Sequence, residues 1–310
     1  MSSKSSTRVQ IIAFQGEQGA YSEAAALKFC PTAVTRPCVA FEDVFRLVGD
    51  GSSDLGIVPF ENSIGGSIHR NFDLLLEHDL PIVAEVELRV VHCLLANRGT
   101  ELSGVRRIYS HPQALAQCDQ FLRRMTGVEV VATYDTAGSA KLIRSQNLPE
   151  EAAIASERAA AVFDLQILAS GIEDFPDNIT RFLLLGSPRI PEGTFGRPDK
   201  TTIVFSLRSV PGALFRALRS FADRQIDLSK LESRPLRGRP WEYLFFADLG
   251  IGRHEGRCRD ALGALDDSVA FVRVLGSYRS ARMSAEVEST SPRDMPVEPG
   301  IGQRTTADGV

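Results

Sequence analysis

Short β-branched runs alternate with helix-like runs over residues 9–164, and this alternation constrains the fold more than any other feature. Strands are predicted at residues 10–15, 33–38, 54–59, 107–109, 128–133 and 152–155, each followed by a helix. The pattern is typical of βαβ units and a largely parallel sheet. We therefore predict an α/β fold for this part of the chain.

One extended run interrupts the alternation. Residues 81–96 have a strand-like sequence throughout, with no helix inserted. At about 3.3 Å per residue, such a run is long enough to leave one sheet and enter another. We interpret it as a crossover between two lobes.

A different order of elements follows residues 187–200, which contain three prolines and two glycines, the composition of a linker. Strands are predicted at 201–208, 226–235, 242–251 and 271–278, with helices at 211–222 and 256–265. This βαββαβ order is the ferredoxin-like plan. We predict one region at residues 8–190, a second at 199–280 and a disordered tail at 281–310, which lacks aromatic residues.

Composition excludes several classes of partner. The formal charge is −4, without a dense block of Lys and Arg, so nucleic acid is not an expected partner. The histidines lack the HxH and HExxH spacings of metal sites, and we predict no metal. No apolar stretch approaches the roughly 20 residues that span a bilayer, so no membrane contact is expected.

The cysteines and the N-terminus suggest a compartment. The five cysteines form no CxxC pair, and their odd number leaves at least one unpaired in any disulfide scheme, which favours a reducing environment. The polar residues 1–7 leave no room for the apolar segment of a signal peptide. We predict a cytoplasmic location.

Polar residues and glycines are frequent in the loops that join several predicted strands to the helices after them. These loops are residues 16–22, 61–67, 110–113 and 135–136. In open parallel sheets these junctions lie at the carboxyl ends of the strands, where ligands bind. Free N–H groups at helix N-termini suit a small anion with more than one carboxylate. The alternative interpretation is that these residues are ordinary caps and turn glycines.

A further motif opens the apolar strand predicted near residues 179–185. In a regular strand Thr180 and Phe182 face one way and Arg181 the other, because side chains alternate. Only one of these faces can meet a ligand. A purely structural role for the motif is the alternative interpretation.

In this order the motifs resemble those of prephenate dehydratases and their close relatives, the arogenate dehydratases. The motifs are Gly16-x-x-Gly19-x-x-Ser22, Glu61-Asn62-Ser63, Gly66-Ser67, Ser110-His111-Pro112-Gln113, Asp135-Thr136-Ala137 and Thr180-Arg181-Phe182. Two later motifs resemble the regulatory ACT domain of the same enzymes, namely Gly212-Ala213-Leu214-Phe215 and Glu232-Ser233-Arg234-Pro235. Phe60 departs from the smaller aliphatic residue that is frequent in relatives, and no chorismate mutase segment precedes the motifs.

The resemblance implies a two-lobed fold similar to type II periplasmic binding proteins, followed by a ferredoxin-like ACT domain. It also implies prephenate dehydratase activity without a cofactor, feedback regulation by L-phenylalanine, and a homodimer or homotetramer. The implied catalytic residues are Thr180 and Arg181. The implied substrate-binding residues are Gly19, Ser22, Asn62, Ser63, Gly66, Ser67, His111, Gln113, Thr136, Asn178 and Phe182. The implied phenylalanine-binding residues are Gly212, Ala213, Leu214, Phe215, Glu232, Ser233, Arg234 and Pro235.

Several alternatives stay open within the resemblance. Thr180 is expected to donate a proton or hydrogen bond to the leaving hydroxyl, whereas Arg181 either contributes charge or braces the strand. His111 is either a hydrogen-bond donor in the cleft or a structural group beside a helix start. The ACT domain either binds phenylalanine or only dimerises. Arogenate dehydratase is the rival activity, and a non-catalytic binding protein with the same scaffold is the rival class.

Overall fold

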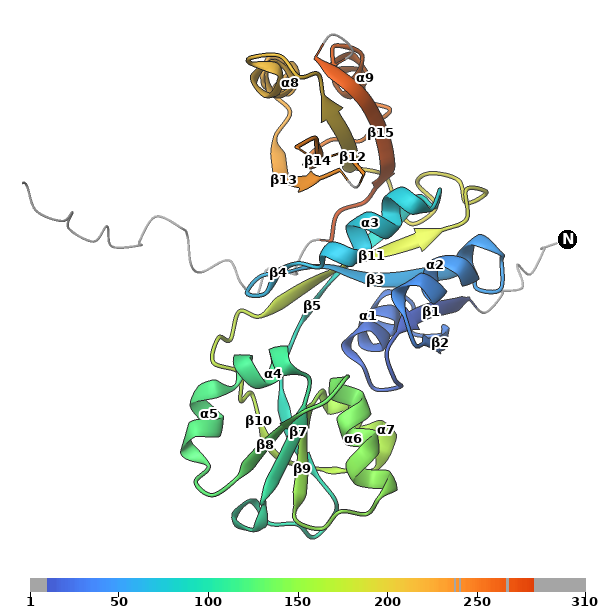
Figure 1. The fold of residues 1–310 in the computed structure, drawn as a ribbon. Coiled ribbons are helices and arrows are strands. Elements are labelled where there is room, and N and C mark those ends of the chain that lie inside the picture. The colour runs from blue at the N-terminus through green and yellow to red at the C-terminus, as the bar shows by residue number, and fades with distance from the viewer. Residues whose placement is uncertain (1–9, 237, 240, 266–267, 282–310) are drawn as a thin grey trace, which may run out of the picture.

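The computed structural model describes residues 10–236, 238–239, 241–265 and 268–281. Three β-sheets organise the described chain, and Figure 1 shows them one above another, with helices on their faces. We call the regions built on these sheets the first lobe, the second lobe and the ferredoxin-like region. The predicted tail at residues 282–310 lies outside the described residues.

The first lobe is a sheet with the strand order β2-β1-β3-β11-β5. Its strands are β1 (Ile11–Gln15), β2 (Val34–Cys38), β3 (Leu55–Asn62), β5 (Ile82–Arg89) and β11 (Ile179–Gly186), and the short β4 (Gly66–Ser67) pairs with the end of β3. The helices are α1 (Tyr21–Phe29), α2 (Phe41–Gly49) and α3 (His69–Glu77).

The second lobe has the strand order β10-β6-β9-β7-β8. These strands are β6 (Cys93–Ala96), β7 (Arg107–Ser110), β8 (Glu129–Ala132), β9 (Glu151–Ala155) and β10 (Gln166–Ser170). The helices are α4 (Pro112–Gln117), α5 (Asp119–Arg124), α6 (Thr136–Ser145) and α7 (Glu157–Phe163), with a 3₁₀ turn η1 (Leu102–Gly104). The extended run at 81–96 divides into β5 in the first sheet and β6 in the second.

The expectation of a largely parallel sheet is only partly correct, because both sheets are mixed: β7 is parallel to β8 and β9, but antiparallel strands join each sheet. β1 is parallel to β2 and β3, but β11 is antiparallel to both of its neighbours, β3 and β5. In the second lobe β6 is antiparallel to β9 and β10. The chain crosses to the second lobe and returns, so the returning strand β11 enters the first sheet in the opposite direction. β10 was not predicted from the sequence.

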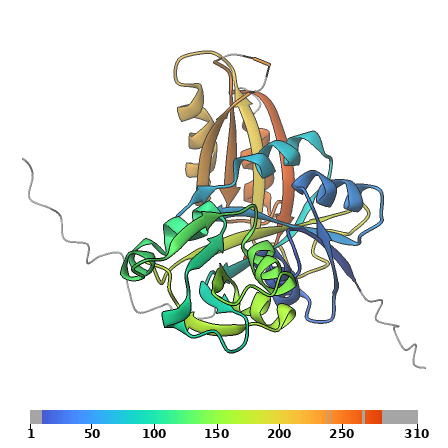
Figure 2. The same ribbon diagram turned by 60° about the horizontal axis from the view of Figure 1, so that its bottom comes forward.

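The ferredoxin-like region comprises residues 200–278. Its elements are β12 (Lys200–Leu207), α8 (Ala213–Ala222), β13 (Leu228–Pro235), β14 (Tyr243–Leu249), α9 (Gly256–Gly263) and β15 (Val269–Tyr278). The sheet order β13-β14-β12-β15 is antiparallel throughout, which confirms the predicted βαββαβ plan. Both helices cover one face of this sheet (Figure 1, Figure 2), above a core that includes Ile203, Phe205 and Phe221.

The opposite face of the same sheet packs on the first lobe. Val204, Phe246 and Tyr278 join one buried cluster with Phe60 and Phe72 of the first lobe. The Phe72 ring stacks on Phe60 at 4.0 Å between centroids and meets Phe246 edge-on at 4.8 Å. Full burial of such side chains is worth about 1.5–3 kcal/mol each. The ferredoxin-like region is therefore joined to the first lobe by a shared apolar core.

This contact requires a glycine at position 276. A Cβ at Gly276 would meet the backbone of Ile82 in β5 and would lie 2.8 Å from the Ile82 Cβ. We expect Gly276→Ala to destabilise the protein by about 1–3 kcal/mol, because overpacking forces the two elements apart. The free energy of unfolding, measured with urea, tests this.

The matched control is Gly263→Ala, at an exposed position on α9 where an added Cβ meets nothing within 4 Å. This variant should stay within about 0.5 kcal/mol of the wild type or become more stable. A wild-type free energy of unfolding for Gly276→Ala would contradict the close approach of β15 and β5.

Candidate active site

A cleft of about 420 Å³ lies between the two lobes. Both lobes contribute polar side chains to it, and apolar residues cover the rest of the wall. Its lining residues are Gln15, Ala20, Tyr21, Ser22, Phe41, Pro59, Asn62, Ile68, Val90, His92, His111, Gln113, Ala114, Gln117, Tyr134, Asp135, Thr136, Thr180 and Phe182. A site of this size and composition suits a small ring compound with polar groups.

The structure brings seven of the predicted site residues together in this cleft. They are Ser22, Asn62, His111, Gln113, Thr136, Thr180 and Phe182. Other predicted residues do not line the cleft, namely Gly19, Ser63, Gly66, Ser67, Asn178 and Arg181.

Thr180 and Asn62 form the central pair of the cleft. They lie opposite each other on the neighbouring strands β11 and β3. The Asn62 Oδ1 accepts from the backbone N–H groups of Ile64 (3.1 Å) and Gly65 (2.6 Å). Its Nδ2 therefore faces the other way and donates to the Thr180 hydroxyl oxygen at 2.9 Å. Because this oxygen already accepts a bond, the hydroxyl hydrogen of Thr180 is left for an acceptor in the cleft.

A chain of hydrogen-bonded side chains continues from Asn62 along the cleft wall, and only Asn178 lies behind the wall. Asn62 Nδ2 also donates to the Oδ1 of buried Asn178 at 2.6 Å. Asn178 Nδ2 in turn donates to Gln117 Oε1 (3.1 Å), and the same oxygen lies 3.0 Å from His92 Nε2. The anchored orientation of Asn62 thus fixes each following amide, and it assigns the hydrogen of the neutral His92 ring to Nε2.

His92 and Tyr21 end this chain. The Tyr21 hydroxyl lies 2.9 Å from His92 Nδ1 and 2.8 Å from the carbonyl of Val91. Burial lowers the pKa of His92 and outweighs the opposing effects of Gln117 and Glu173. Burial also raises the pKa of Tyr21 well above its ordinary value. Both groups are therefore neutral at physiological pH, and the chain joins the two lobes through uncharged hydrogen bonds.

Three of the predicted residues outside the cleft shape the loops around it. Gly19 has a positive φ of 89°, and an added Cβ would lie 2.7 Å from the backbone of Ala159 in α7. Ser63 bonds the Asp177 carbonyl (2.8 Å) and the Ile179 N–H (2.9 Å), which ties its loop to β11. Gly66 has a φ of 74°, in the left-handed region that favours glycine.

Gln113 comes close to the same loop from the second lobe. An added Cβ at Gly65 would lie only 2.1 Å from the Gln113 Nε2, so a larger residue there would force this amide to shift. His111 has a structural role as well as a place in the cleft wall, because its Nδ1 caps α4 by accepting from the Gln113 N–H at 3.2 Å. Its two interpretations are therefore compatible.

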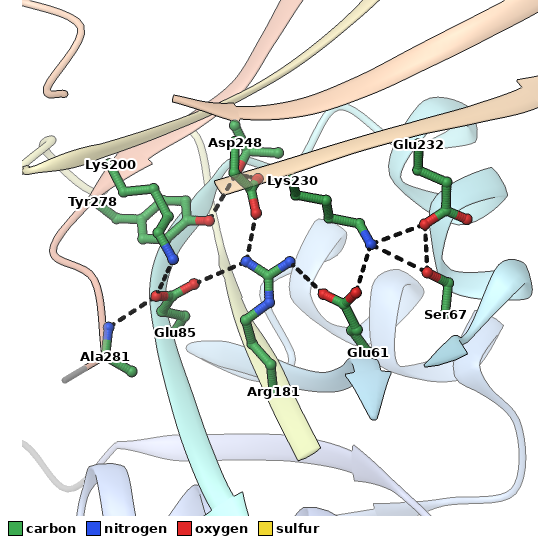
Figure 3. Close-up of polar contacts among 11 residues, drawn as sticks. Glu61, Ser67, Glu85, Arg181, Lys200, Lys230, Glu232, Asp248, Tyr278 and Ala281 are labelled. Atoms are coloured by element: carbon green, nitrogen blue, oxygen red, sulfur yellow. Dashed lines mark hydrogen bonds and ion pairs between the residues drawn. The ribbon is translucent and has the colours of Figure 1, made fainter. Parts of the chain in front are cut away.

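Ser67 and Arg181 face the ferredoxin-like region and not the cleft. Ser67 does not cap α3, whose N-cap residue is Ile68, and its hydroxyl donates to Glu232. Arg181 reaches Asp248 of β14 at 2.5 Å (Figure 3). The side chain of Arg181 is only 11% exposed. Since Thr180 faces the cleft and Arg181 the opposite side, the predicted alternation along β11 is confirmed.

Helix N-termini supply positive potential to the cleft. α1 begins there at Tyr21 without a side-chain cap. α6 begins there at Thr136, with Asp135 accepting from the N–H groups of Ala137 (2.8 Å) and Gly138 (3.4 Å). The lining residues include no Lys or Arg. An anion would therefore be held by amides, hydroxyls and helix dipoles.

The described part of the chain offers no cluster of three or more His, Cys, Asp or Glu side chains placed to hold a metal ion. All five cysteines are free thiols. In the same residues, every helix is too short or too polar to cross a membrane.

Comparison with known proteins identifies the scaffold. A family model described as Prephenate dehydratase matches residues 12–189. The chain belongs to the prephenate dehydratase family. Arogenate dehydratase/prephenate dehydratase 2 of Arabidopsis thaliana is 49% identical, over 86% of this chain and 72% of the relative. Arogenate dehydratase 2 of Petunia hybrida is 47% identical, over 87% of this chain and 71% of the relative.

Solved structures agree with the family. The prephenate dehydratase of Arthrobacter aurescens, solved with L-Phe, is 34% identical with a TM-score of 0.78, over 86% of this chain and 89% of that one. GqqA, described as a novel type of quorum quenching acylase, is 35% identical with a TM-score of 0.79, over 88% of this chain and 98% of that one. The two-lobed fold with a ferredoxin-like region is thus a prephenate dehydratase fold.

The prediction of a cytoplasmic location is wrong by comparison with these relatives. Arabidopsis relatives that are 49% and 46% identical are named as chloroplastic proteins. The cysteine pattern and the polar residues 1–7 were the basis for the prediction. Unpaired cysteines indicate a reducing environment, but they do not distinguish one reducing compartment from another.

Sequence reasoning missed several residues of the cleft, among them Tyr21, His92, Gln117 and Tyr134. Gln117 lies four residues after Gln113 in α4, and this spacing puts two side chains on one helix face. His92 is a polar residue inside the apolar run at 90–96. These two signals could have been found, whereas the positions of Tyr21 and Tyr134 depend on how the lobes meet.

We expect His92 to make stability depend on pH. Its folded pKa lies below the ordinary 6.5 because of burial, so the unfolded chain binds more protons between these two values. The stability that the neutral His92 ring contributes is fully present above about pH 6.5. It is lost as the pH falls from there toward the folded pKa. We therefore measure how far the free energy of unfolding falls when the pH is lowered from about 7.5 to about 5.5. This fall should be smaller in His92→Gln than in the wild type.

His254→Gln is the control, because that side chain is 71% exposed. It should keep the pH dependence of the wild type in the same urea titrations. Equal losses of stability in the wild type and His92→Gln would show that the buried ring does not contribute.

Proposed function

We propose that this chain catalyses the decarboxylating dehydration of prephenate to phenylpyruvate. The observation that carries the proposal is the hydroxyl of Thr180, whose oxygen accepts from Asn62 and whose hydrogen is free for a group in the cleft. Family membership and the amide-rich wall of the cleft support the same reaction. L-phenylalanine biosynthesis is the context that the family implies.

The chemistry needs orientation and one proton. Prephenate carries a ring carboxylate, a pyruvyl side chain with a second carboxylate, and a ring hydroxyl on the opposite side. The bond to the ring carboxylate breaks and releases CO₂, and its electron pair moves through the ring and breaks the bond to the hydroxyl. This oxygen takes up a proton and leaves as water. The departing oxygen takes the electron pair of the broken C–O bond, and the ring becomes aromatic.

Thr180 would donate its hydrogen bond to the departing oxygen. Free threonine is far too weak an acid to give up its proton alone, so transfer is concerted with departure of the oxygen, and a proton from solvent would restore the hydroxyl. Asn62 positions Thr180 by donating to its oxygen, and its hydrogen bonds to the backbone keep it from turning. Asn62 therefore fixes the direction in which the Thr180 O–H group points before the substrate reacts.

The two carboxylates would bind the polar wall of the cleft. We place them among Ser22, Gln113 and Thr136, beside the N-termini of α1 and α6. Apolar groups such as Phe182 and Val90 would cover the ring and exclude water. Gly19, Ser63, Gly66 and Asn178 would act on the shape of this site rather than on the substrate, and Arg181 would brace β11.

The ferredoxin-like region would serve as an ACT domain that binds L-phenylalanine. The relative from Arthrobacter aurescens was solved with L-Phe, and the two predicted motifs lie at the start of α8 and in β13. Gly212 is the N-cap of α8, with Ala213 buried and Phe215 68% exposed, while Leu214 is half-buried. In β13, Ser233 and Pro235 are exposed, whereas Glu232 and Arg234 turn toward the first lobe. We further propose that the chain forms a homodimer or homotetramer.

Arogenate dehydration is the second candidate function. The relatives from Arabidopsis thaliana and Petunia hybrida are named for arogenate, and three of the Arabidopsis names include both substrates. Arogenate differs from prephenate by an amino group in place of the side-chain ketone. The ratio of kcat/KM on the two substrates decides between them.

Replacing Thr180 tests the reaction directly. We expect Thr180→Ala to fold and to lose about 10² to 10⁴-fold in kcat, because one placed proton donor supplies about that much. Thr180→Ser keeps the hydroxyl and should retain most of the activity. Turnover is followed by the ultraviolet absorbance of phenylpyruvate. Near-normal turnover in Thr180→Ala would remove this residue from the mechanism.

Regulation is tested by titrating the purified protein with L-phenylalanine at a fixed prephenate concentration. We expect activity to change along a saturation curve, with a coupling on the order of 1–3 kcal/mol between the two sites. L-leucine is the control for specificity. A flat curve would leave the ferredoxin-like region with a role in dimer formation alone.

A further inference from the structure

The strands that carry Thr180 and Asn62 carry a second pair on their opposite face. The register pairs Thr180 with Asn62 and the next residue, Arg181, with Glu61. Successive side chains of a strand point to opposite faces. The first pair therefore faces the cleft and the second faces the ferredoxin-like region, and Arg181 Nη2 lies 3.1 Å from Glu61 Oε2.

This second pair belongs to a group of acidic and basic side chains that we call the charge cluster (Figure 3), mostly buried except for Glu61, whose side chain is 37% exposed. Its members are Glu61, Glu85 and Arg181 of the first lobe, together with Lys200, Lys230, Glu232 and Asp248 of the ferredoxin-like region. Arg181 Nη1 lies 2.5 Å from Asp248 Oδ2 and 3.4 Å from Glu85 Oε2. Lys200 Nζ approaches Glu85 Oε1 at 2.5 Å.

Lys230 makes the corresponding contact to the other strand. Its Nζ lies 2.9 Å from Glu61 Oε1, 2.9 Å from Glu232 Oε2 and 3.2 Å from Ser67 Oγ. Glu61 immediately precedes Asn62 in β3. The ferredoxin-like region thus holds both strands, β11 through Asp248 and β3 through Lys230, each one residue away from the cleft pair.

The surroundings make these contacts strong. The side chain of Asp248 is 1% exposed and that of Glu85 is fully buried. Burial opposes the charge of Arg181, but Asp248, Tyr278 and Glu85 outweigh it and raise the pKa of Arg181. Removing one partner of such a pair leaves the other as an uncompensated buried charge, which is strongly unfavourable. Loss of Asp248, the most buried partner from the ferredoxin-like region, would therefore favour a shift of β11.

We propose that Asp248 and Lys230 of the ferredoxin-like region are positioning residues for the catalytic pair, acting through Arg181 and Glu61. The proposal rests on the proposed function. It makes the C-terminal region a structural part of the active site, in addition to any ligand that the region binds. Glu232 belongs to the Glu232–Pro235 motif and also contacts Ser67 and Lys230. A ligand that engages this motif would thereby act on β3.

The test compares two interdomain ion pairs, of which the control is somewhat more exposed, at 16% and 13% against 11% and 1%. Asp248→Asn removes the carboxylate that Arg181 contacts and keeps an oxygen for the Thr202 hydroxyl, which lies 2.7 Å from Asp248 Oδ1. Asp73→Asn breaks the pair between Asp73 of α3 and Arg234 of β13, at 3.1 Å, which also joins the first lobe to the ferredoxin-like region but touches neither β3 nor β11. Both variants are made in the full chain.

We expect Asp248→Asn to lose about 10 to 10²-fold in kcat with little change in KM, since small displacements of a reacting group cost about that much. Asp73→Asn should keep the wild-type kcat. Arg181→Lys retains the charge but cannot reach all three carboxylates, and its kcat should fall between the two. A folded Asp248→Asn with wild-type kcat overturns the proposal. An equal loss of kcat in Asp73→Asn also overturns the proposal, because the loss would then follow from breaking any interdomain ion pair and would not be specific to the charge cluster.

A second measurement is independent of activity. Hydrogen–deuterium exchange at residues 179–186 should be faster in Asp248→Asn than in the wild type and unchanged in Asp73→Asn. Unchanged exchange in Asp248→Asn overturns the proposal. If the wild type acts on neither prephenate nor arogenate, the proposed function fails and exchange alone decides the positioning role. Should Asp248→Asn not fold, Lys230→Met tests the same cluster from the β3 side with the same expected losses.

Discussion

The pairing of β3 with β11 is the constraint on which the rest of the molecule depends. One cross-strand pair, Thr180 with Asn62, places a hydroxyl at the cleft, and the adjoining pair, Arg181 with Glu61, places charge on the other side. The two-residue period of a strand makes these environments immediate neighbours in sequence while keeping them on separate faces of the sheet. The same pairing of β3 with β11 thus positions the side chains at the cleft and those that contact the ferredoxin-like region.

The cleft depends on the way the chain passes twice between the lobes. Residues 90–92 lead out of the first sheet and residues 171–178 lead back, and the hydrogen-bonded chain from Asn62 to Tyr21 lies where these segments meet. The uncharged groups of this chain cost less to bury than ions would. This part of the cleft wall is therefore uncharged and fixed in direction, although it is built from both lobes.

Much of this arrangement could be read from local patterns in the sequence. The βαββαβ order of the last region follows from strand and helix periodicity, and the alternation of Thr180 and Arg181 follows from strand geometry alone. The direction of β11 could not be read in this way, because nothing local to residues 179–186 distinguishes a parallel from an antiparallel neighbour. The partners of Arg181 could not be predicted from local sequence either, because Glu61 and Asp248 are distant from it in the chain.

The buried faces of the first lobe set a limit on how the chain can be divided. The family match ends at residue 189, before the ferredoxin-like region begins. Phe60 and Phe72 pack under Phe246, and Arg181 loses Asp248 if the later residues are removed. A truncated protein that stops at the linker would expose aromatic surface and an unbalanced carboxylate pair. The smallest stable unit is therefore larger than the segment that the family model matches. Exchange of C-terminal regions between relatives also requires matched charges where this region contacts the first lobe.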